Sequence, residues 1–194
     1  MNKSIILDDL QIQHKIRRIA YQIYETNINE KEIILAGIRE NGFIFAQRIQ
    51  EILSEISPIE VKLCEVVLDK KKPREPIQTS LPPDAYRNRS LILLDDVLNS
   101  GTTLIYAAKH FLEVPLKRFN TAVLVNRNHK KYPIKADFKG ISLSTSLQEH
   151  IHVEFGKNKP SPTSNRPVYC NLRISETIVS TESSSMGMIW SARS

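Results

Sequence analysis

Two adjacent carboxylates, Asp95 and Asp96, precede a turn of hydroxyl residues and a glycine at positions 100–103. Hydroxyl and backbone N–H groups at the start of a helix bind phosphate, and the partial positive charge there favours an anion. Gly101 lets the backbone approach a phosphate closely. The carboxylates can accept hydrogen bonds from sugar hydroxyls and share a divalent metal. These residue types in this order predict a sugar-phosphate site.

The elements on either side of these residues are suited to position them. Residues 91–94 are four consecutive aliphatic residues and predict a buried strand. After the turn, a helix is predicted with an apolar face made of Leu104, Ala107, Ala108 and Phe111. A response-regulator-like strand end also carries an apolar run and two acids. In that fold the acids lie near the N-terminus, and no hydroxyl-glycine turn opens the next helix.

The rest of the chain alternates between strands and helices. A first helix is predicted after Asp8 or Asp9, and a second around positions 43–53. Strands are predicted at residues 32–36, 61–68, 91–95, 120–125 and 151–155. This alternation predicts an α/β fold with parallel strands and right-handed crossovers. The acid pair is then expected at the carboxyl edge of the sheet, where open α/β sheets bind ligands.

Composition is that of a soluble enzyme of one main domain. The chain has 194 residues, two cysteines and a formal net charge of +6. The cysteines form no CxxC pair, so neither a disulfide framework nor a zinc site is indicated. No apolar run is long enough to span a membrane, and the first ten residues do not read as a signal peptide, so a cytoplasmic protein without membrane partners is expected. The positive charge suits a polyanionic ligand or RNA, and ordinary surface lysines also account for it.

Two segments are expected to lack regular structure. Residues 69–90 are polar and rich in Lys, Arg and Pro, which is typical of a functional lid or a disordered loop. A main domain is predicted over residues 1–159, followed by a Ser/Thr/Pro-rich extension over residues 160–194. The extension is expected to be disordered, with residues 174–179 as an alternative edge strand.

The segment from Leu91 to Leu112 resembles the phosphoribosyl-pyrophosphate (PRPP) motif of type I phosphoribosyltransferases. Residues 124–138, LVNRNHKKYPIKADF, are similar to the PyrR family's LVDRGHRELPIRADY. Residues 5–8, 18–23 and 35–49 also resemble that family, and the likeness spans roughly residues 4–156 in the family's order. It implies the type I phosphoribosyltransferase fold, a central mostly parallel sheet flanked by helices with a small hood. It also implies a magnesium-dependent homodimer or larger homo-oligomer that binds PRPP and a nucleobase.

The resemblance also implies roles for individual residues. Asp95, Asp96 and Arg39 would be catalytic, and Asp95 and Asp96 would hold Mg²⁺. The PRPP-binding residues would be Arg39, Asp95, Asp96, Val97, Leu98, Asn99, Ser100, Gly101, Thr102 and Thr103. Arg127 would lie near the base. Contacts to RNA would come from Arg18, His129, Lys130, Lys131 and Lys135.

Several positions depart from the family pattern. Where the family commonly has K-T-R-G in its pyrophosphate loop, residues 39–42 read Arg-Glu-Asn-Gly, so Asn41 replaces the second cation and Glu40 adds a negative charge. The family's T-L-Y-R-D-D segment is not recognisable, and Lys70, Lys71, Lys72 and Arg74 are the cations that could close over pyrophosphate.

Three functions are consistent with these residues. Purine enzymes usually carry an acid where this chain has Asn99, and PyrR-like proteins usually carry a tyrosine, so Asn99 departs from both patterns. Because an amide cannot act as a general base, the usual purine chemistry is disfavoured, and uracil is the predicted acceptor. The expected activity is transfer of ribose 5-phosphate from PRPP to uracil in pyrimidine salvage. The first alternative is a nucleotide-sensing regulator that binds pyrimidine-operon RNA. The second is a PRPP-dependent enzyme with another acceptor.

Overall fold

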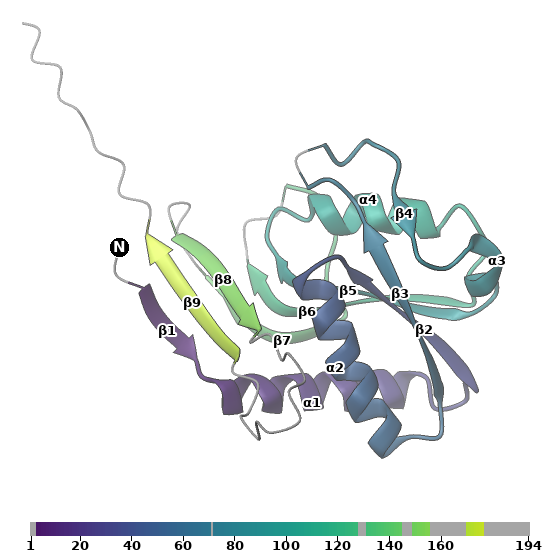
Figure 1. Cartoon of the computed structure of the whole chain (residues 1–194), viewed down its shortest axis with the longest axis horizontal. Helices are drawn as coiled ribbons and strands as arrows, with labels where there is room; N and C mark the ends of the chain where they lie inside the picture. The colour runs from purple at the N-terminus through teal and green to yellow at the C-terminus, as the bar shows by residue number, and fades with distance from the viewer. Residues whose placement is uncertain (1–2, 71, 128–130, 145–148, 156–169, 177–194) are drawn as a thin grey trace, which may run out of the picture.

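The computed structural model describes residues 3–70, 72–127, 131–144, 149–155 and 170–176, which form two sheets (Figure 1). The larger sheet has six strands in the order β4-β3-β2-β5-β6-β7. Their bounds are β2 Glu32–Ile38, β3 Glu60–Val67, β4 Gln78–Thr79, β5 Ser90–Leu98, β6 Arg118–Arg127 and β7 Phe138–Leu143. All neighbours pair in parallel except β3 and β4. The mostly parallel central sheet is confirmed.

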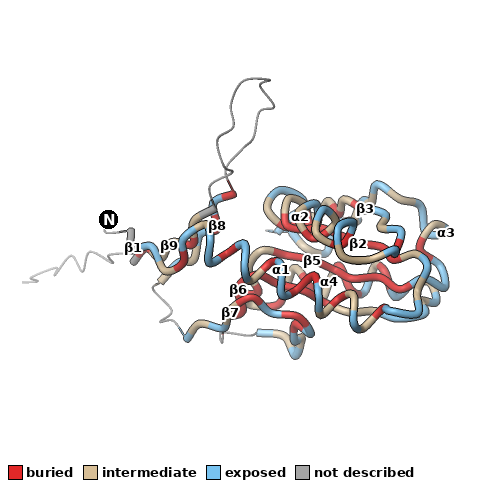
Figure 2. Tube along the Cα trace, turned by 90° about the horizontal axis from the view of Figure 1, so that it is seen from below, coloured by how far each residue is buried: buried red, intermediate tan, exposed pale blue. Residues whose placement is uncertain are grey.

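Helices cover both faces of this sheet. The helices are α1 Asp9–Thr26, α2 Asn41–Ile56, α3 Pro83–Tyr86 and α4 Thr102–Phe111. Alternate residues of a strand point to opposite faces. Leu35 and Leu94 accordingly pack with α1 and α2, whereas Ala36 and Leu93 pack with α4. Buried positions therefore run along the strands between the two helical layers (Figure 2).

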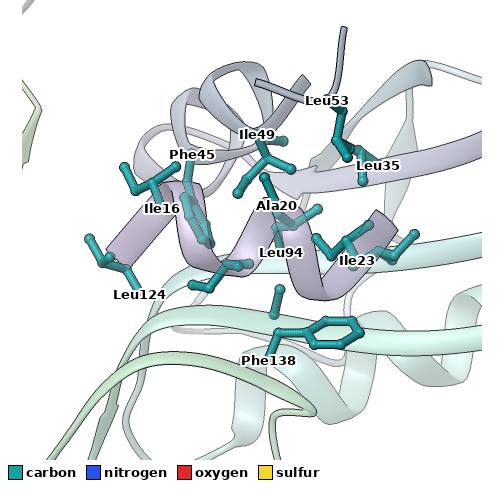
Figure 3. Close-up of a cluster of buried hydrophobic side chains, with 14 of the residues drawn as sticks. Ile16, Ala20, Ile23, Leu35, Phe45, Ile49, Leu53, Leu94, Leu124 and Phe138 are labelled. Atoms are coloured by element: carbon teal, nitrogen blue, oxygen red, sulfur yellow. The ribbon is translucent and has the colours of Figure 1, made fainter. Parts of the chain in front are cut away.

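The first helix forms for the reasons its sequence indicates. Asp8 caps it: its side chain accepts from the Gln11 backbone N–H, and the Gln11 side chain accepts from the Asp8 backbone N–H. The predicted apolar face is fully buried, and it consists of Ile12, Ile16, Ile19, Ala20 and Ile23. This face packs with α2 against the central strands, as Figure 3 shows for Ile16, Ala20 and Ile23 beside Phe45 and Leu94.

The small second sheet is the hood. Its strands are β1 Lys3–Leu7, β8 Glu149–Phe155 and β9 Cys170–Glu176, in the order β1-β9-β8 and entirely antiparallel. The strand predicted at residues 151–155 therefore exists, but it belongs to the hood and not to a parallel βαβ unit. The hood joins the first and last described strands of the chain.

The expected disorder of the extension is wrong for residues 170–176. That segment is β9, the middle strand of the hood, and it pairs with β1 on one side and β8 on the other. Leu172 is fully buried. Residues 160–169 and 177–194 lie outside the described residues, and the boundary at residue 159 stays a prediction.

The polar stretch at residues 69–90 also contains regular structure. Strand β4 pairs with β3, and the single turn α3 places Tyr86 in the core. The Tyr86 ring lies edge to face with that of Phe111, with 5.1 Å between the ring centroids.

Strand β7 was not expected, because its six residues alternate apolar and polar side chains only weakly. None of the helices within the described ranges is long and apolar enough to cross a membrane.

Candidate functional site

The acid pair lies near the carboxyl end of β5, between β2 and β6. Gly37 of β2 pairs with Leu94, and Asp95 pairs with Val123 of β6. The pair is therefore at the carboxyl edge of the central sheet, as the sequence indicates. Asp95 is only 3% exposed, whereas Asp96 is half-buried. The two carboxylates thus occupy environments of different polarity.

Burial dominates the electrostatics of Asp95. Desolvation raises the pKa of Asp95 well above its ordinary value, and the neighbouring charge of Asp96 raises it further. Lys70, from the loop that carries Lys70, Lys72 and Arg74 (the basic loop), lowers the same pKa by its positive charge. One Asp95 oxygen, Oδ1, accepts from the Asp96 backbone N–H at 3.1 Å. A cation placed beside Asp95 would therefore stabilise its ionised form.

Asp96 is oriented by two hydrogen bonds. Its Oδ1 accepts from the backbone N–H of Val97 at 2.9 Å, and its Oδ2 accepts from Nδ2 of Asn41 at 2.8 Å. Asn41 is the first residue of α2, so the start of that helix contacts the acid pair directly. An added Cβ at Gly42 would lie 3.0 Å from the Leu94 carbonyl oxygen, so a larger residue would crowd this close approach.

The hydroxyl-glycine turn places two hydroxyl groups at the start of α4. Gly101 has φ 82°, a left-handed conformation that glycine adopts without strain, and it directly precedes α4. Oγ of Ser100 lies 2.8 Å from Oγ1 of Thr102 and accepts from the Thr102 backbone N–H at 3.3 Å. The first free amides of α4 and these hydroxyls therefore meet at one place.

Two of the predicted PRPP-binding residues contribute only backbone to this site. The side chain of Leu98 is 1% exposed and packs with α4, and Val97 is partly buried against the core shared with α1 and α2. Their side chains belong to the core that fixes the turn. The PRPP-binding assignments at these positions stay predictions.

A second segment braces the turn from the side. The backbone N–H groups of Lys131 and Tyr132 both donate to the Ser100 carbonyl, at 2.8 and 3.2 Å. Nη1 of Arg127, a residue that is 5% exposed, donates to Oδ1 of Asn99 at 3.1 Å. The structure thus brings Arg127, the predicted base-binding residue, to the residue that precedes the turn.

The predicted pyrophosphate loop lies at the end of β2. The backbone N–H of Arg39 donates to the Val66 carbonyl, and its side chain, 59% exposed, forms an ion pair with Glu65 at 3.3 Å. Glu40 has φ 72°, which is unfavourable for a residue other than glycine. Arg39 is therefore at the correct edge of the sheet, but in this structure its guanidinium contacts β3 and not the acid pair.

The basic loop borders a cavity that the sequence did not predict. The cavity has a volume of about 590 Å³, and among its lining residues are Lys70, Arg74, Thr102, Tyr106 and Lys131. A hydrogen bond from Arg74 lowers the pKa of the Tyr106 hydroxyl, and the Tyr106 ring lies edge to face with that of Tyr132 at 6.3 Å. Cations therefore extend from the hydroxyl-glycine turn towards solvent. In the sequence, the one sign of this cavity is that Tyr106 lies in the helix that follows the turn.

Among the described residues predicted to bind RNA, Arg18 and Lys131 lie on opposite faces of the central sheet. Nη2 of Arg18, on α1, donates to the carbonyls of Lys139 and Gly140, each at 2.7 Å. Lys131 lines the cavity beside α4, on the opposite face of the sheet from α1. The Lys135 carbonyl accepts from Thr121 in β6 at 2.9 Å. His129 and Lys130 lie outside the described residues.

The donor set suits a magnesium ion that arrives with its substrate. Among the described residues, no group of three or more His, Cys, Asp or Glu side chains could hold a metal by itself. Mg²⁺ is usually bound by one or two carboxylates together with substrate phosphates and water. Asp95 and Asp96 supply such carboxylates, and a cation would offset the negative charge of two adjacent carboxylates, one of which is buried.

Comparison with known proteins defines the class. A family model for the phosphoribosyl transferase domain matches residues 3–159. The fold is similar to that of a hypoxanthine-guanine phosphoribosyltransferase from Bacillus anthracis, with a TM-score of 0.66 at 17% identity, over 88% of this chain and 98% of that one. A hypoxanthine phosphoribosyltransferase from Trypanosoma cruzi also gives 0.66, at 13% identity, over 87% and 95% of the chains. The chain has the type I phosphoribosyltransferase fold.

Relatives in sequence identify the family within this class. The chain is 40% identical over 158 residues to "Bifunctional protein PyrR" of Streptococcus thermophilus, covering 79% of this chain and 90% of the relative. It is 38% identical over 162 residues to the protein of the same name in Macrococcus caseolyticus, covering 79% and 92%. The chain belongs to the PyrR-like type I phosphoribosyltransferases.

The buried charge of Asp95 makes a prediction about stability and pH. Because burial raises the folded-state pKa, ionisation costs stability as the pH rises from the unfolded value through the folded one. Asp95→Asn removes that cost, so its melting temperature at about pH 7.5 should exceed that of the wild type by at least about 3 °C. The gain should disappear below the ordinary carboxyl pKa of 3.8. Thermal unfolding followed by circular dichroism, in acid and at neutral pH, measures the gain and its disappearance.

The matched control is Asp96→Asn. This variant removes only the charge beside Asp95 and leaves its desolvation, the larger cause of the raised pKa of Asp95, so its gain in melting temperature should be smaller than that of Asp95→Asn. A gain for Asp95→Asn that is the same in acid and at neutral pH would contradict the buried-charge interpretation.

Proposed function

We propose that the protein transfers ribose 5-phosphate from PRPP to uracil, giving UMP and diphosphate. The observation that carries this proposal is the meeting of the acid pair and the hydroxyl-glycine turn at one edge of the sheet. The turn supplies donors for the 5-phosphate, and the carboxylates supply acceptors for the ribose hydroxyls. A sugar phosphate bound between them has its anomeric carbon above the acid pair.

The acid pair also suits the electrostatics of the transfer. As diphosphate departs, the anomeric carbon gains positive character, and a negative field nearby stabilises it. Asp95 is desolvated, so its interaction with a developing cation is stronger than it would be in water. Bound Mg²⁺ would neutralise charge on the departing oxygens. Lys70, whose charge already acts on Asp95, would help the basic loop to exclude water.

Asn99 supports a pyrimidine acceptor. Purine enzymes of this class usually carry an acid at this position, and an amide cannot take a proton as a general base. Its Oδ1 already accepts from Arg127, so its side chain is held against the start of the turn. The purine substrates named for the similar solved structures belong to those proteins, since a likeness at 13–17% identity supports the fold alone.

Arg39 is the proposed diphosphate contact. Its ion pair with Glu65 is exposed and therefore weak, so a diphosphate can compete for the guanidinium. Asn41, which replaces the second cation of the usual loop, is engaged with Asp96. The proposal therefore assigns diphosphate binding to Arg39, the first amides of α2 and the basic loop.

A base screen tests the proposal. With PRPP and Mg²⁺ present, uracil should give the fastest diphosphate release among uracil, hypoxanthine, guanine and adenine. The PyrR-like segments and Asn99 are the reasons for this expectation. Robust turnover of guanine or hypoxanthine without turnover of uracil would reject uracil and favour a PRPP-dependent enzyme with another acceptor.

Binding of pyrimidine-operon RNA is the second candidate function. It is favoured by the name "bifunctional" that the relatives carry and by the exposed lysines at positions 131 and 135. Arg18 is a weaker candidate for an RNA contact than the sequence indicates, because its guanidinium already binds two backbone carbonyls. Its structural role is to join α1 to strand β7.

The salt dependence of RNA affinity tests this second candidate. Lys130→Gln with Lys135→Gln should reduce the slope of log affinity against log salt by about 1 to 2, measured on the operon leader RNA with UMP present. Lys131 is left unchanged because it lines the cavity beside the turn, where its side chain could also act on the enzyme site. Arg18→Gln is the contrast and should lower the melting temperature more than it changes the slope. Absence of wild-type binding at low salt would remove the regulatory function.

A further inference from the structure

One face of α2 contacts both the acid pair and the hood. Asn41 and Arg48 lie seven residues apart, two helical turns, and therefore share a face of the helix. Both contact β8 of the hood. Nδ2 of Asn41 donates to the Val153 carbonyl at 2.9 Å, and the Arg48 guanidinium lies over the Phe155 ring at 4.8 Å from its centroid.

The Asn41 amide joins two parts of the molecule that otherwise belong to different sheets. Besides Val153 in the hood, Nδ2 donates to Oδ2 of Asp96 in the central sheet at 2.8 Å. An amide nitrogen has two hydrogens, and these two bonds use both of them. Asp96 and Val153 are therefore held by the same nitrogen atom, in a partly buried setting.

The geometry of β8 explains why the hood needs this bond. β8 is an edge strand, since the order of the hood strands is β1-β9-β8. An edge strand presents backbone groups that no neighbouring strand satisfies. The Val153 side chain is buried, and its carbonyl, which faces α2, finds its donor in Asn41. The hood is thus fixed to the acid pair at one backbone carbonyl.

We propose that Asn41 is a positioning residue that sets the place of the hood relative to Asp96. The inference rests on the proposed function in one respect: the hood must bound the space in which the acceptor base meets the ribose. An arginine at this position, as the usual loop has, would supply a cation for diphosphate. This chain has the neutral Asn41 in its place. Asn41 supplies no cation, but its two hydrogen bonds fix the distance between Asp96 and the hood.

Arg48 provides an internal comparison for this role. Its contact with Phe155 also attaches α2 to β8, but none of its described contacts reaches Asp96. Arg48→Met keeps the aliphatic stem and removes the cation over the ring. This variant loosens the hood alone, whereas a variant at Asn41 disturbs the hood and Asp96 together.

The experiment compares Asn41→Asp, Asn41→Gln and Arg48→Met with the wild type. Asp has nearly the shape of Asn but no amide hydrogens, and its charge would face Asp96. Gln keeps both hydrogens on a longer side chain. Hydrogen–deuterium exchange of the β8 amides is measured first, in the ligand-free protein, so this result does not depend on the substrate. Steady-state kinetics with PRPP and uracil follow.

We expect Asn41→Asp and Arg48→Met both to increase exchange in β8. Asn41→Asp should also lower kcat at least about tenfold through misplacement of Asp96, while Arg48→Met raises the KM for the base and leaves kcat within about threefold. Asn41→Gln should show a smaller increase in exchange and a smaller fall in kcat than Asn41→Asp.

Unchanged exchange in β8 for Asn41→Asp would overturn the proposal, and so would an equal fall in kcat for Arg48→Met. If the wild type turns over no base at all, the proposed function fails, and the exchange measurement alone decides whether Asn41 fixes the hood to the acid pair.

Discussion

The buried carboxylate of Asp95 is the constraint around which the site is built. A carboxylate that is 3% exposed has lost most of its hydration, and its neighbour Asp96 adds a second negative charge. The site therefore favours positive charge, whether from Lys70, from Mg²⁺ or from a sugar carbon that is losing diphosphate. An interaction that strengthens as positive charge develops lowers the barrier of the reaction more than it strengthens substrate binding. In the proposed reaction, the same burial that lowers stability would therefore contribute to catalysis.

The parallel sheet explains how so few residues make this site. Strands β2 and β5 end at the same edge, and each is followed directly by the N-terminus of a helix, α2 or α4. The positive ends of both helix dipoles therefore lie beside the acid pair. Gly42 lets α2 approach β5 closely, and Gly101 allows the turn that opens α4. In the proposed function, α2 contacts the hood and would bind diphosphate, and α4 would bind the 5-phosphate.

The sequence was sufficient for features that depend on local pattern. The isoleucine face of α1 has a helical period, the apolar run before Asp95 is continuous, and the hydroxyl-glycine turn is marked by its residue types. It was insufficient where partners are distant in the chain. Asn41 lies 55 residues from Asp96 and 112 from Val153, so its double hydrogen bond leaves no local signal. Strand β9 is polar at alternate positions and is held by two neighbouring strands, which its own composition does not reveal.

The most direct test of this account is a crystal structure of the protein with UMP bound. We expect the 5-phosphate to lie against the hydroxyls of Ser100 and Thr102 and the first amides of α4. The two ribose hydroxyls should lie within hydrogen-bonding distance of Asp95 and Asp96. A phosphate bound in the cavity beside Arg74, with the ribose away from both carboxylates, would contradict the assignment of the acid pair and the turn to one sugar-phosphate site.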